Sequence, residues 1–377
     1  MLLNKIAQIN PRPDHKTPTK IGYIDTSSSY EGKVLEIQEL SSKFPSRAKR
    51  QVKEHDILIS SVRPENLHNC YVLSKRSDLI ASTGYIQIRV VNNQYNSRWL
   101  YYYLTTPKMV KYYDSIANSS QTTFPAFNSS VFENIDIPEL SLEIQQHIVG
   151  TIGTIDDLIE KEKAIVSTEI KIVGSLFEIL MDNANNRKLS TIGEITSKVS
   201  TGLNPRKNFK LGLGNNFYVT VKNFVTDNLM LDDRCDKVTN EALAKINRRS
   251  DLRKGDVLMS GIGTIGRIYL ISTEPRNWNI SESVFSLRAK DDIGSAFLYS
   301  LLKSKDFQSY ALSNASGSAQ QGLRMEFLKA YRFHMPTMEQ LALFNKKAKD
   351  ILDSAAVSQK KVQSLESLKS LFLQKYF

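Results

Sequence analysis

The feature that most constrains the fold of this 377-residue chain is an internal repeat, whose two copies lie nearly two hundred residues apart. HDILISSV (55–62) aligns with GDVLMSGI (255–262), so that Asp56, Leu58 and Ser60 match Asp256, Leu258 and Ser260. Farther along, IQIRV (86–90) aligns with FSLRA (285–289), SSQTTF (119–124) with SAQQGL (318–323), and IDIP, ending at Pro138, with RFHMP, ending at Pro336. Because the order is kept and the offset is nearly constant, the sequence predicts two copies of one domain.

Each copy ends in a stretch whose apolar residues recur at steps of three and four, the spacing of a helix seam. Glu162 interrupts the first seam and Ser358 the second. A helix of some 35 residues would span roughly 50 Å, more than the core of one domain needs, so we expect the two helices to pair with each other. The alternative is two ordinary amphipathic helices, each packed on its own domain. The predicted seam residues are Ile152, Ile155, Ile159, Val166, Ile170, Val173, Phe177 and Leu180 in the first helix, and Phe344, Ile351, Val362 and Leu365 in the second.

The predicted fold class is therefore α+β, with a globular domain and a long helix in each half of the chain. We expect the two similar globular domains to be separated by the two long helices, which pair as an antiparallel coiled coil and give the internal repeat an approximate two-fold axis. The predicted boundaries are 1–147 and 187–336 for the globular domains, and 148–186 and 337–377 for the helices.

The segment DVLMSGIGTIGRIYLIS (256–272) contains the pattern G-x-G-x-x-G at Gly261, Gly263 and Gly266. A dinucleotide-binding loop requires a helix after the third glycine, because the helix N-terminus supplies the donors to the pyrophosphate. Here the third glycine is followed by RIYLIS, which is rich in β-branched and aromatic residues and predicts a strand. The first copy has SSVRPENLHN at this place, without a glycine. We therefore interpret the segment as a loop between two strands. The loop differs in sequence between the two copies because each copy recognises a different target.

The composition is that of a folded protein, with 41% hydrophobic and 24% charged residues, and the net charge is +11. Most of the excess lies in residues 187–336, whose 23 basic and 14 acidic residues give +9, as a polyanion binder requires. The alternative is a charge that serves only solubility. Cys70 and Cys235 are the two cysteines, and they predict neither a disulfide framework nor a zinc site. The chain shows no secretory signal and no membrane-spanning stretch, so a cytoplasmic location is expected.

These motifs, taken in order, resemble the specificity subunit of type I restriction and modification systems. The resemblance rests on KLSTIGEI (188–195), YVTVKNF (218–224), LRKGDVLMSGIGTIGRIYL (252–270) and MPTMEQLALF (335–344), and on IGYIDTSSS, AKRQVKEHDILISSV and IPELSLEIQQHI in the first copy. It covers essentially the whole chain. One departure is a difference in length, since 47 residues separate Ile9 from Asp56, whereas 61 separate Ile195 from Asp256.

The resemblance implies two target-recognition domains, each of which reads one half of a bipartite duplex DNA sequence, and two conserved helices that recruit partners. The implied partners are double-stranded DNA, two methyltransferase subunits, and restriction or translocase subunits, in a prokaryotic cytoplasm and without a membrane. The implied cofactors, S-adenosylmethionine, ATP and Mg²⁺, are expected on the partner subunits, and none on this chain.

Two other functions are compatible with parts of the sequence. Asp14, Glu31 and Lys33 satisfy a loose nuclease pattern in which two carboxylates hold Mg²⁺ and a lysine polarises the phosphate, although the second copy has no counterpart. The other alternative is a coiled-coil protein scaffold without DNA specificity. A methyltransferase is excluded by the absence of an N-P-P-aromatic motif, since Asn204 and Pro205 are followed by Arg206 and Lys207.

Candidate DNA contacts are basic, amide and hydroxyl residues predicted to lie in turns near the strands of the repeat. Lys and Arg can neutralise phosphates, and Arg, Asn and Gln can form paired hydrogen bonds with base edges. The candidates are Arg47, Lys49, Arg50, Arg63, Ser120 and Gln121 in the first domain, and Arg206, Lys207, Lys222, Asn223, Arg248, Arg249, Thr264, Gln320, Gln321 and Arg324 in the second.

Overall fold

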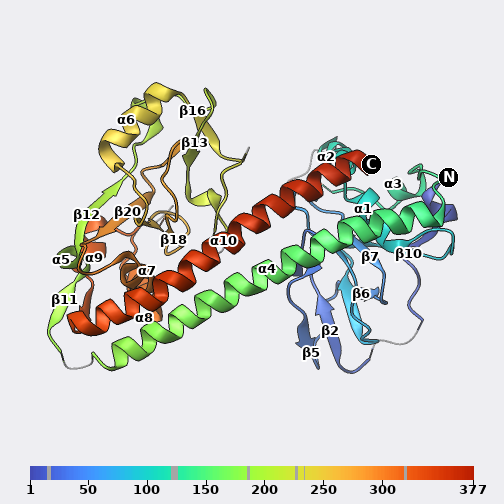
Figure 1. Cartoon of the computed structure of the whole chain (residues 1–377). Helices are drawn as coiled ribbons and strands as arrows, with labels where there is room; N and C mark the ends of the chain where they lie inside the picture. The colour runs from blue at the N-terminus through green and yellow to red at the C-terminus, as the bar shows by residue number, and fades with distance from the viewer. Residues whose placement is uncertain (15–17, 120–125, 185–186, 226–227, 233, 318–320) are drawn as a thin grey trace. The chain divides into compact units, whose positions relative to one another are not determined.

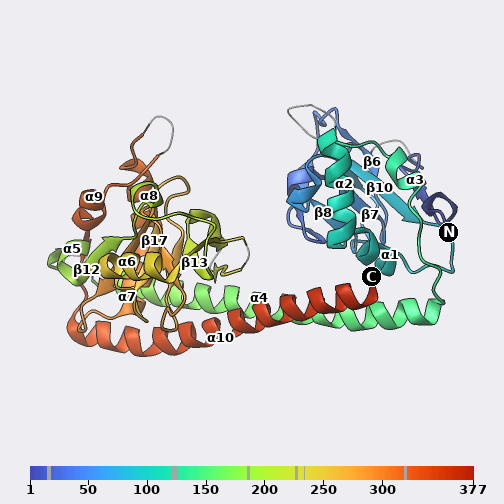
Figure 2. The same ribbon diagram turned by 90° about the horizontal axis from the view of Figure 1, so that it is seen from above.

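A computed structural model of the chain describes residues 1–14, 18–119, 126–184, 187–225, 228–232, 234–317 and 321–377. The chain forms two compact units, which are shown in Figures 1 and 2. Unit 1 consists of Met1–Leu158 and Leu365–Phe377, and unit 2 consists of Ile159–Ser364. Each unit therefore contains one copy of the repeat together with parts of both long helices.

Unit 1 is built on two four-stranded sheets. The first has the order β1-β10-β7-β8 and is antiparallel throughout, and the second has the order β5-β2-β9-β6 with β2 and β9 parallel. The strands are β1 (Ala7–Ile9), β2 (Ile21–Ile24), β3 (Ser29–Tyr30), β4 (Lys33–Val34), β5 (Gln38–Leu40), β6 (Ala48–Gln51), β7 (Ile57–Ser60), β8 (Asn69–Tyr71), β9 (Leu79–Ser82) and β10 (Tyr85–Val90). The helices are η1 (Leu3–Lys5), η2 (Thr26–Ser28), η3 (Pro64–Asn66), α1 (Ser97–Leu104), α2 (Pro107–Ser119), α3 (Ser130–Glu133) and the first part of α4 (Leu142–Asp182).

Unit 2 repeats this plan with one three-stranded sheet. Its first sheet has the order β12-β20-β17-β18 and is antiparallel, and its second has the order β16-β13-β19 with β13 and β19 parallel. The strands are β11 (Leu189–Thr191), β12 (Thr196–Thr201), β13 (Asn216–Val219), β14 (Phe224–Val225), β15 (Asn228–Leu229), β16 (Asp236–Val238), β17 (Val257–Ser260), β18 (Ile268–Leu270), β19 (Trp278–Ile280), β20 (Val284–Ala289) and β21 (Arg332–His334). The helices are α5 (Ile192–Ile195), η4 (Pro205–Lys207), η5 (Val221–Asn223), α6 (Asn240–Ser250), α7 (Ser295–Lys303), α8 (Lys305–Ser313), α9 (Met325–Ala330) and most of α10 (Met338–Tyr376).

The α+β class and the internal repeat are confirmed, because strands aligned in the sequence occupy equivalent places in the two sheets. The aligned segments 55–62 and 255–262 form β7 and β17, and the segments 86–90 and 285–289 lie in β10 and β20. The aligned segments 119–124 and 318–323 fall mostly outside the described residues. The difference in length has a structural cause: β17 of unit 2 is preceded by α6, an 11-residue helix capped by Thr239, whereas β7 of unit 1 is preceded by β6.

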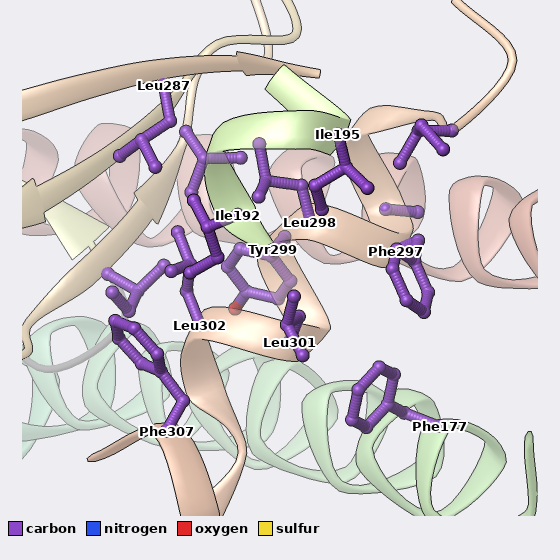
Figure 3. Close-up of a cluster of buried hydrophobic side chains, with 14 of the residues drawn as sticks. Phe177, Ile192, Ile195, Leu287, Phe297, Leu298, Tyr299, Leu301, Leu302 and Phe307 are labelled. Atoms are coloured by element: carbon purple, nitrogen blue, oxygen red, sulfur yellow. The ribbon is translucent and has the colours of Figure 1, made fainter. Parts of the chain in front are cut away.

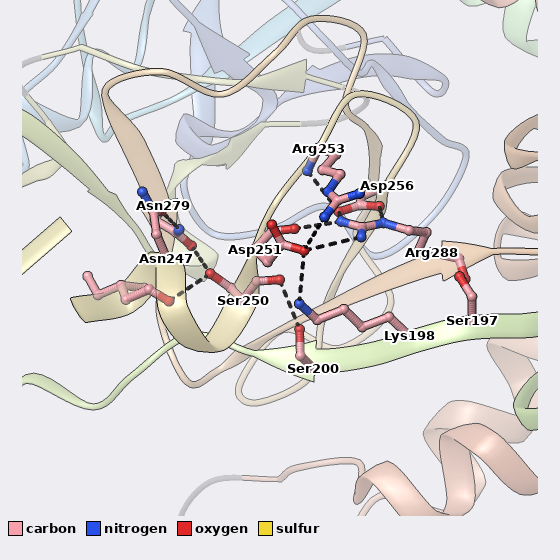
Figure 4. Close-up of polar contacts among 11 residues, drawn as sticks. Ser197, Lys198, Ser200, Asn247, Ser250, Asp251, Arg253, Asp256, Asn279 and Arg288 are labelled. Carbon is pink, nitrogen blue, oxygen red and sulfur yellow. Dashed lines mark hydrogen bonds and ion pairs between the residues drawn. The ribbon is translucent and has the colours of Figure 1, made fainter. Parts of the chain in front are cut away.

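A buried carboxylate paired with an arginine stands at the start of the equivalent strands β7 and β17. Asp56 accepts hydrogen bonds from Nε and Nη2 of Arg89, at 2.8 and 2.7 Å, and Asp256 accepts them from Nε and Nη2 of Arg288, at 2.7 and 2.9 Å. Figure 4 shows the second pair, with Asp251 beside Arg288. The carboxylates of Asp56 and Asp256 also accept hydrogen bonds from the backbone N–H groups of Lys53 and Arg253, respectively. At least three donors to each buried carboxylate offset the cost of removing its charge from water.

In unit 2 the seams of α4 and α10 pack on α7, which lies against the first sheet. Phe177 of α4, Phe297 of α7 and Phe344 of α10 form one cluster, with ring centroids 5.7 to 6.4 Å apart. Figure 3 shows Phe177 turned toward Phe297 and the leucines of α7. Glu162 contacts Lys361 at 3.2 Å, and Phe177 lies against Phe344, so α4 and α10 run antiparallel. The two interruptions of the predicted seams meet here, because Glu162 also hydrogen-bonds with Ser358, which lowers the pKa of Glu162.

In unit 1 the two helices meet in the same antiparallel sense. Asp156 of α4 contacts Lys369 of α10 at 2.7 Å, and His147 lies against Tyr376. Tyr102 of α1 donates a hydrogen bond to Asp156 at 2.6 Å, which ties α1 to the long helix. Across both units, the predicted seam residues Ile152, Ile155, Ile159, Val166, Val173, Phe177, Leu180, Phe344 and Val362 are buried, and Ile170, Ile351 and Leu365 are half-buried.

Removing the buried charge at Asp256 should destabilise unit 2. Asp256→Asn keeps the shape of the side chain but leaves Arg288 without its principal partner, and we expect a loss of about 2 kcal/mol, reduced from the fully buried case because Arg288 is partly exposed. Urea unfolding followed by the fluorescence of Trp278 in a Trp99→Phe background measures unit 2 alone, because the chain has two tryptophans. Asp251→Asn is the matched control, since Asp251 is more exposed and should cost less than about 1 kcal/mol. Equal losses from both variants would contradict the structural role of the pair.

Adjacent residues on α4 should respond oppositely to a charge. Val173 is 1% exposed in the core of unit 2, whereas its neighbour Ile172 is 46% exposed. Val173→Asp buries an unpaired carboxylate and should cost about 3 kcal/mol or more, whereas Ile172→Asp should cost less than about 1 kcal/mol. The same Trp278 unfolding measurement compares them. If Ile172→Asp proved the more damaging variant, the assigned helix faces would be incorrect.

Candidate nucleic-acid interface

The glycine-rich segment of unit 2 is the loop of a β-hairpin, as its sequence predicts. β17 and β18 pair antiparallel on either side of it, and no helix follows Gly266. Gly263 and Gly266 have φ values of +82° and +87°, which a side chain would make unfavourable. A Cβ on Gly261 would come within 2.3 Å of the ring of Phe285, and one on Gly266 within 2.1 Å of the Gln308 side chain. The glycines therefore serve a tight turn and close packing.

Backbone hydrogen bonds hold this loop against the segment that precedes α9. The N–H of Gly263 donates to the carbonyl of Gln321 at 2.8 Å, and the N–H of Leu323 donates to the carbonyl of Gly261 at 2.8 Å. Ile262 and Gly322 form a bridge between them. The arrangement brings together two elements that carry the exposed candidates Thr264, Gln321 and Arg324. Gln320 lies outside the described residues.

Unit 1 holds the loop between β7 and β8 in the same manner. The N–H of Phe127 donates to the carbonyl of Ser61 at 3.0 Å, and Val62 forms a bridge with Ala126. The loop has no glycine, and Arg63 takes a left-handed conformation with φ +47° before η3. Arg63 is exposed, whereas Ser120 and Gln121 lie outside the described residues. The same scaffold therefore presents two loops of different sequence and shape.

The remaining basic candidates of unit 2 lie on short helices at the surface. Arg206 and Lys207 are exposed on η4, whose first turn is capped by Asn204. Arg248 and Arg249 are exposed in the last turn of α6, where the guanidinium of Arg249 also donates to Thr201 at 3.2 Å. Lys222 is exposed on η5.

Asn223 has a local structural role that the amino-acid sequence does not reveal. Its side chain is 4% exposed, and its Oδ1 accepts hydrogen bonds from the N–H and the hydroxyl of Thr220, at 2.8 and 3.2 Å. Because these bonds hold the turn at η5, Asn223 is not available at the surface for contact with a base. Arg267, which follows the hairpin loop, is likewise engaged, since its guanidinium donates to the carbonyl of Phe224.

The other candidates of unit 1 lie on β6 and just before it. Arg47 and Lys49 are exposed, whereas Arg50 is half-buried. Within the part of the chain that the structure describes, Nε of Arg50 is buried without a hydrogen-bond partner, and this burial lowers the pKa of the guanidinium. Arg47 and Lys49 therefore remain the more accessible pair for contact with phosphate.

Across the ranges described above, no three His, Cys, Asp or Glu side chains are grouped so that they could hold a metal ion. Burial raises the pKa of the Cys70 thiol to about 12, which removes its nucleophilic thiolate at neutral pH. Asp14 is paired with Lys53, so the residues of the nuclease pattern gain no support as a metal site. Among the described helices, none has both the length and the apolar composition needed to cross a bilayer.

Comparison with known proteins places the chain in one family. The family model for the type I restriction modification DNA specificity domain matches it twice, over residues 5–171 and 181–367. The specificity subunit of the type I restriction enzyme HindI of Haemophilus influenzae is 30% identical over 173 residues, which are 45% of this chain and 37% of that protein. The specificity subunit of the enzyme MjaIX of Methanocaldococcus jannaschii is 32% identical over 108 residues, which are 29% of this chain and 24% of that protein. The alignments thus span little more than a third of these relatives, or less.

A solved structure has the same fold over the full length of this chain. The S subunit of a type I restriction-modification system from M. genitalium aligns with 100% of this chain and 95% of its own, with a TM-score of 0.57 and 14% sequence identity. At that identity the likeness concerns the fold alone. Because the family model matches most of the sequence, once in each copy of the repeat, this chain belongs to the family of type I restriction modification DNA specificity domains.

Proposed function

We propose that this chain is the non-catalytic, sequence-specific DNA-binding subunit of a type I restriction and modification system. Each globular domain, 1–147 and 187–336, binds one half of a bipartite duplex target. The observation that carries the proposal is the pair of equivalent hairpin loops, which stand on the same scaffold and are held by the same backbone contacts but differ in sequence. A repeated scaffold with unequal loops suits a protein that reads two different half-sites.

The charge and exposure of the candidate residues support DNA as the ligand. Residues 187–336 carry a net charge of +9, and their candidate basic residues are exposed on η4, η5, α6 and the segment before α9. Such side chains can neutralise phosphates and release counterions, while the hairpin loops contact base edges. The protein-scaffold alternative offers no reason for this distribution of charge.

Catalysis in this proposal belongs to partner subunits. The long helices α4 and α10 recruit two methyltransferase subunits, and restriction subunits join the complex. S-adenosylmethionine, ATP and Mg²⁺ are bound by those partners. The ring cluster of Phe177, Phe297 and Phe344 supports a fixed attachment of the helices to the globular part of unit 2, which a reader that directs a catalytic partner requires.

The full-length chain should select one duplex sequence and bind it with a steep dependence on salt. Selection from a pool of random duplexes, followed by titration of the selected DNA between 50 and 200 mM salt, measures both properties. If six or more phosphates are neutralised, the affinity should fall about a thousandfold or more over this range. Arg206→Ala/Lys207→Ala should reduce the salt slope, by about 0.9 for each lost phosphate contact. A chain that enriches no sequence would exclude the proposal.

Exchanging one globular domain should change the sequence of one recognised half-site. Replacing residues 188–336 by the corresponding segment of a relative should alter one half of the methylated sequence in cells and leave the other half unchanged, because each loop stands on its own scaffold. Methylome sequencing detects the outcome, with replacement of residues 1–147 as the reciprocal control. If either replacement altered both half-sites together, the two domains would not read independently.

A further inference from the structure

Unit 2 presents two leucines at the tip of a loop. The loop connects η4 with β13, and its residues 210–215, of sequence KLGLGN, are all exposed. Leu211 is 36% exposed and Leu213 is 51% exposed. We name residues 210–214 the leucine tip. Exposed apolar residues are common singly, but two in one short loop together offer a small apolar contact surface.

The base of this loop is held in place by unit 2. Phe209 packs edge-on against Tyr218, with ring centroids 5.5 Å apart, and Lys245 donates a hydrogen bond to the carbonyl of Asn208. The N–H of Gly212 donates to the carbonyl of Lys237 at 2.9 Å. The leucine tip is therefore attached on both sides, so contact with a ligand requires little ordering of the chain.

Two glycines allow the tip to turn where a side chain would not fit. Gly212 and Gly214 have φ values of +79° and +82°. A Cβ on Gly214 would lie 2.5 Å from the carbonyl oxygen of Val238, so the backbone at this position closely approaches the end of β16. The glycines thus alternate with the leucines, so that Leu211 and Leu213 are the apolar side chains of the tip.

The surroundings of the leucine tip are basic. Arg206, Lys207 and Lys210 precede or begin the tip, and all three are exposed. Three cations beside an apolar loop favour a nucleic acid duplex over a protein surface as the partner. Phosphates line both edges of a duplex groove, and the three cations could neutralise them while the leucines enter the groove.

The sequence of the first copy lacks the two leucines. Its corresponding segment, PRPDHKTPTK (11–20), contains no leucine, isoleucine, valine or phenylalanine. The leucine tip is therefore a feature of one reader rather than of the shared scaffold, as expected of an element that contributes to the specificity of one half-site.

We propose that Leu211 and Leu213 make apolar contact with the bases of the half-site that unit 2 reads, while Arg206, Lys207 and Lys210 hold the flanking phosphates. This inference rests on the proposed function and adds a specificity-determining element to it. Leucine side chains can contact the methyl group of thymine or the face of a base step, and neither contact releases counterions.

The salt dependence of binding separates this role from that of the lysines. The full-length Leu211→Ala/Leu213→Ala variant should bind the DNA selected by the wild-type chain about tenfold more weakly or worse, with an unchanged salt slope, and should bind unrelated duplex DNA as the wild type does. Lys207→Ala/Lys210→Ala should instead lower the slope and weaken binding to both DNAs. Leu211→Met/Leu213→Met should restore most of the affinity, because methionine keeps the apolar volume.

Leu189→Ala is the matched control, since Leu189 is also 51% exposed but lies on β11. It should bind as the wild type does, and the melting temperatures of all variants should agree. A leucine variant that binds the selected DNA with wild-type affinity, or loses equal affinity for unrelated DNA, overturns the inference while leaving the proposed function intact. A wild-type chain that selects no sequence overturns the proposed function itself.

Discussion

The structure depends on the burial of one apolar face of each long helix. In unit 2 the apolar faces of α4 and α10 pack on each other and on α7, through Phe177, Phe344 and Phe297. In unit 1 the apolar face of α4 lies on α1, with Ile148 and Ile152 in the same core as Trp99. Because the seam residues serve both the helix pair and the globular core, neither can be rearranged without exposing apolar surface of the other.

Polar contacts then select one arrangement of the two long helices, which apolar burial alone does not determine. Apolar contact is non-directional, so it does not by itself select one arrangement of two seams. Glu162, Ser358 and Lys361 provide a polar layer within the helix pair, and Asp156 joins α1 and α10 to α4 through Tyr102 and Lys369. Within each first sheet, a buried aspartate and arginine hold the start of the strand whose other end carries the variable loop. A rigid strand lets the loop differ without disturbing the core.

The sheets are common to both copies, whereas the loops and peripheral elements differ between them. The loop that follows β7 has no glycine, whereas the loop that follows the equivalent strand β17 has three. The same strands are preceded by β6 in unit 1 and by α6 in unit 2. The leucine tip is a further difference. Such divergence at the ends of strands that both copies share agrees with the proposed function of reading two half-sites.

The sequence by itself determined the repeat, the strand-turn-strand character of the glycine loop and the seams of the long helices, because each depends on spacing along the chain. Only the tertiary structure decided that the glycine loop lies against Gln321 and Leu323, that Asp256 pairs with Arg288, and that Asn223 is buried in its own turn. The tertiary structure also brings Glu162 next to Ser358. In the sequence, these two residues are visible only as separate interruptions of the two helix seams. These contacts join residues that packing brings together, or turn a side chain inward, and no local periodicity encodes them.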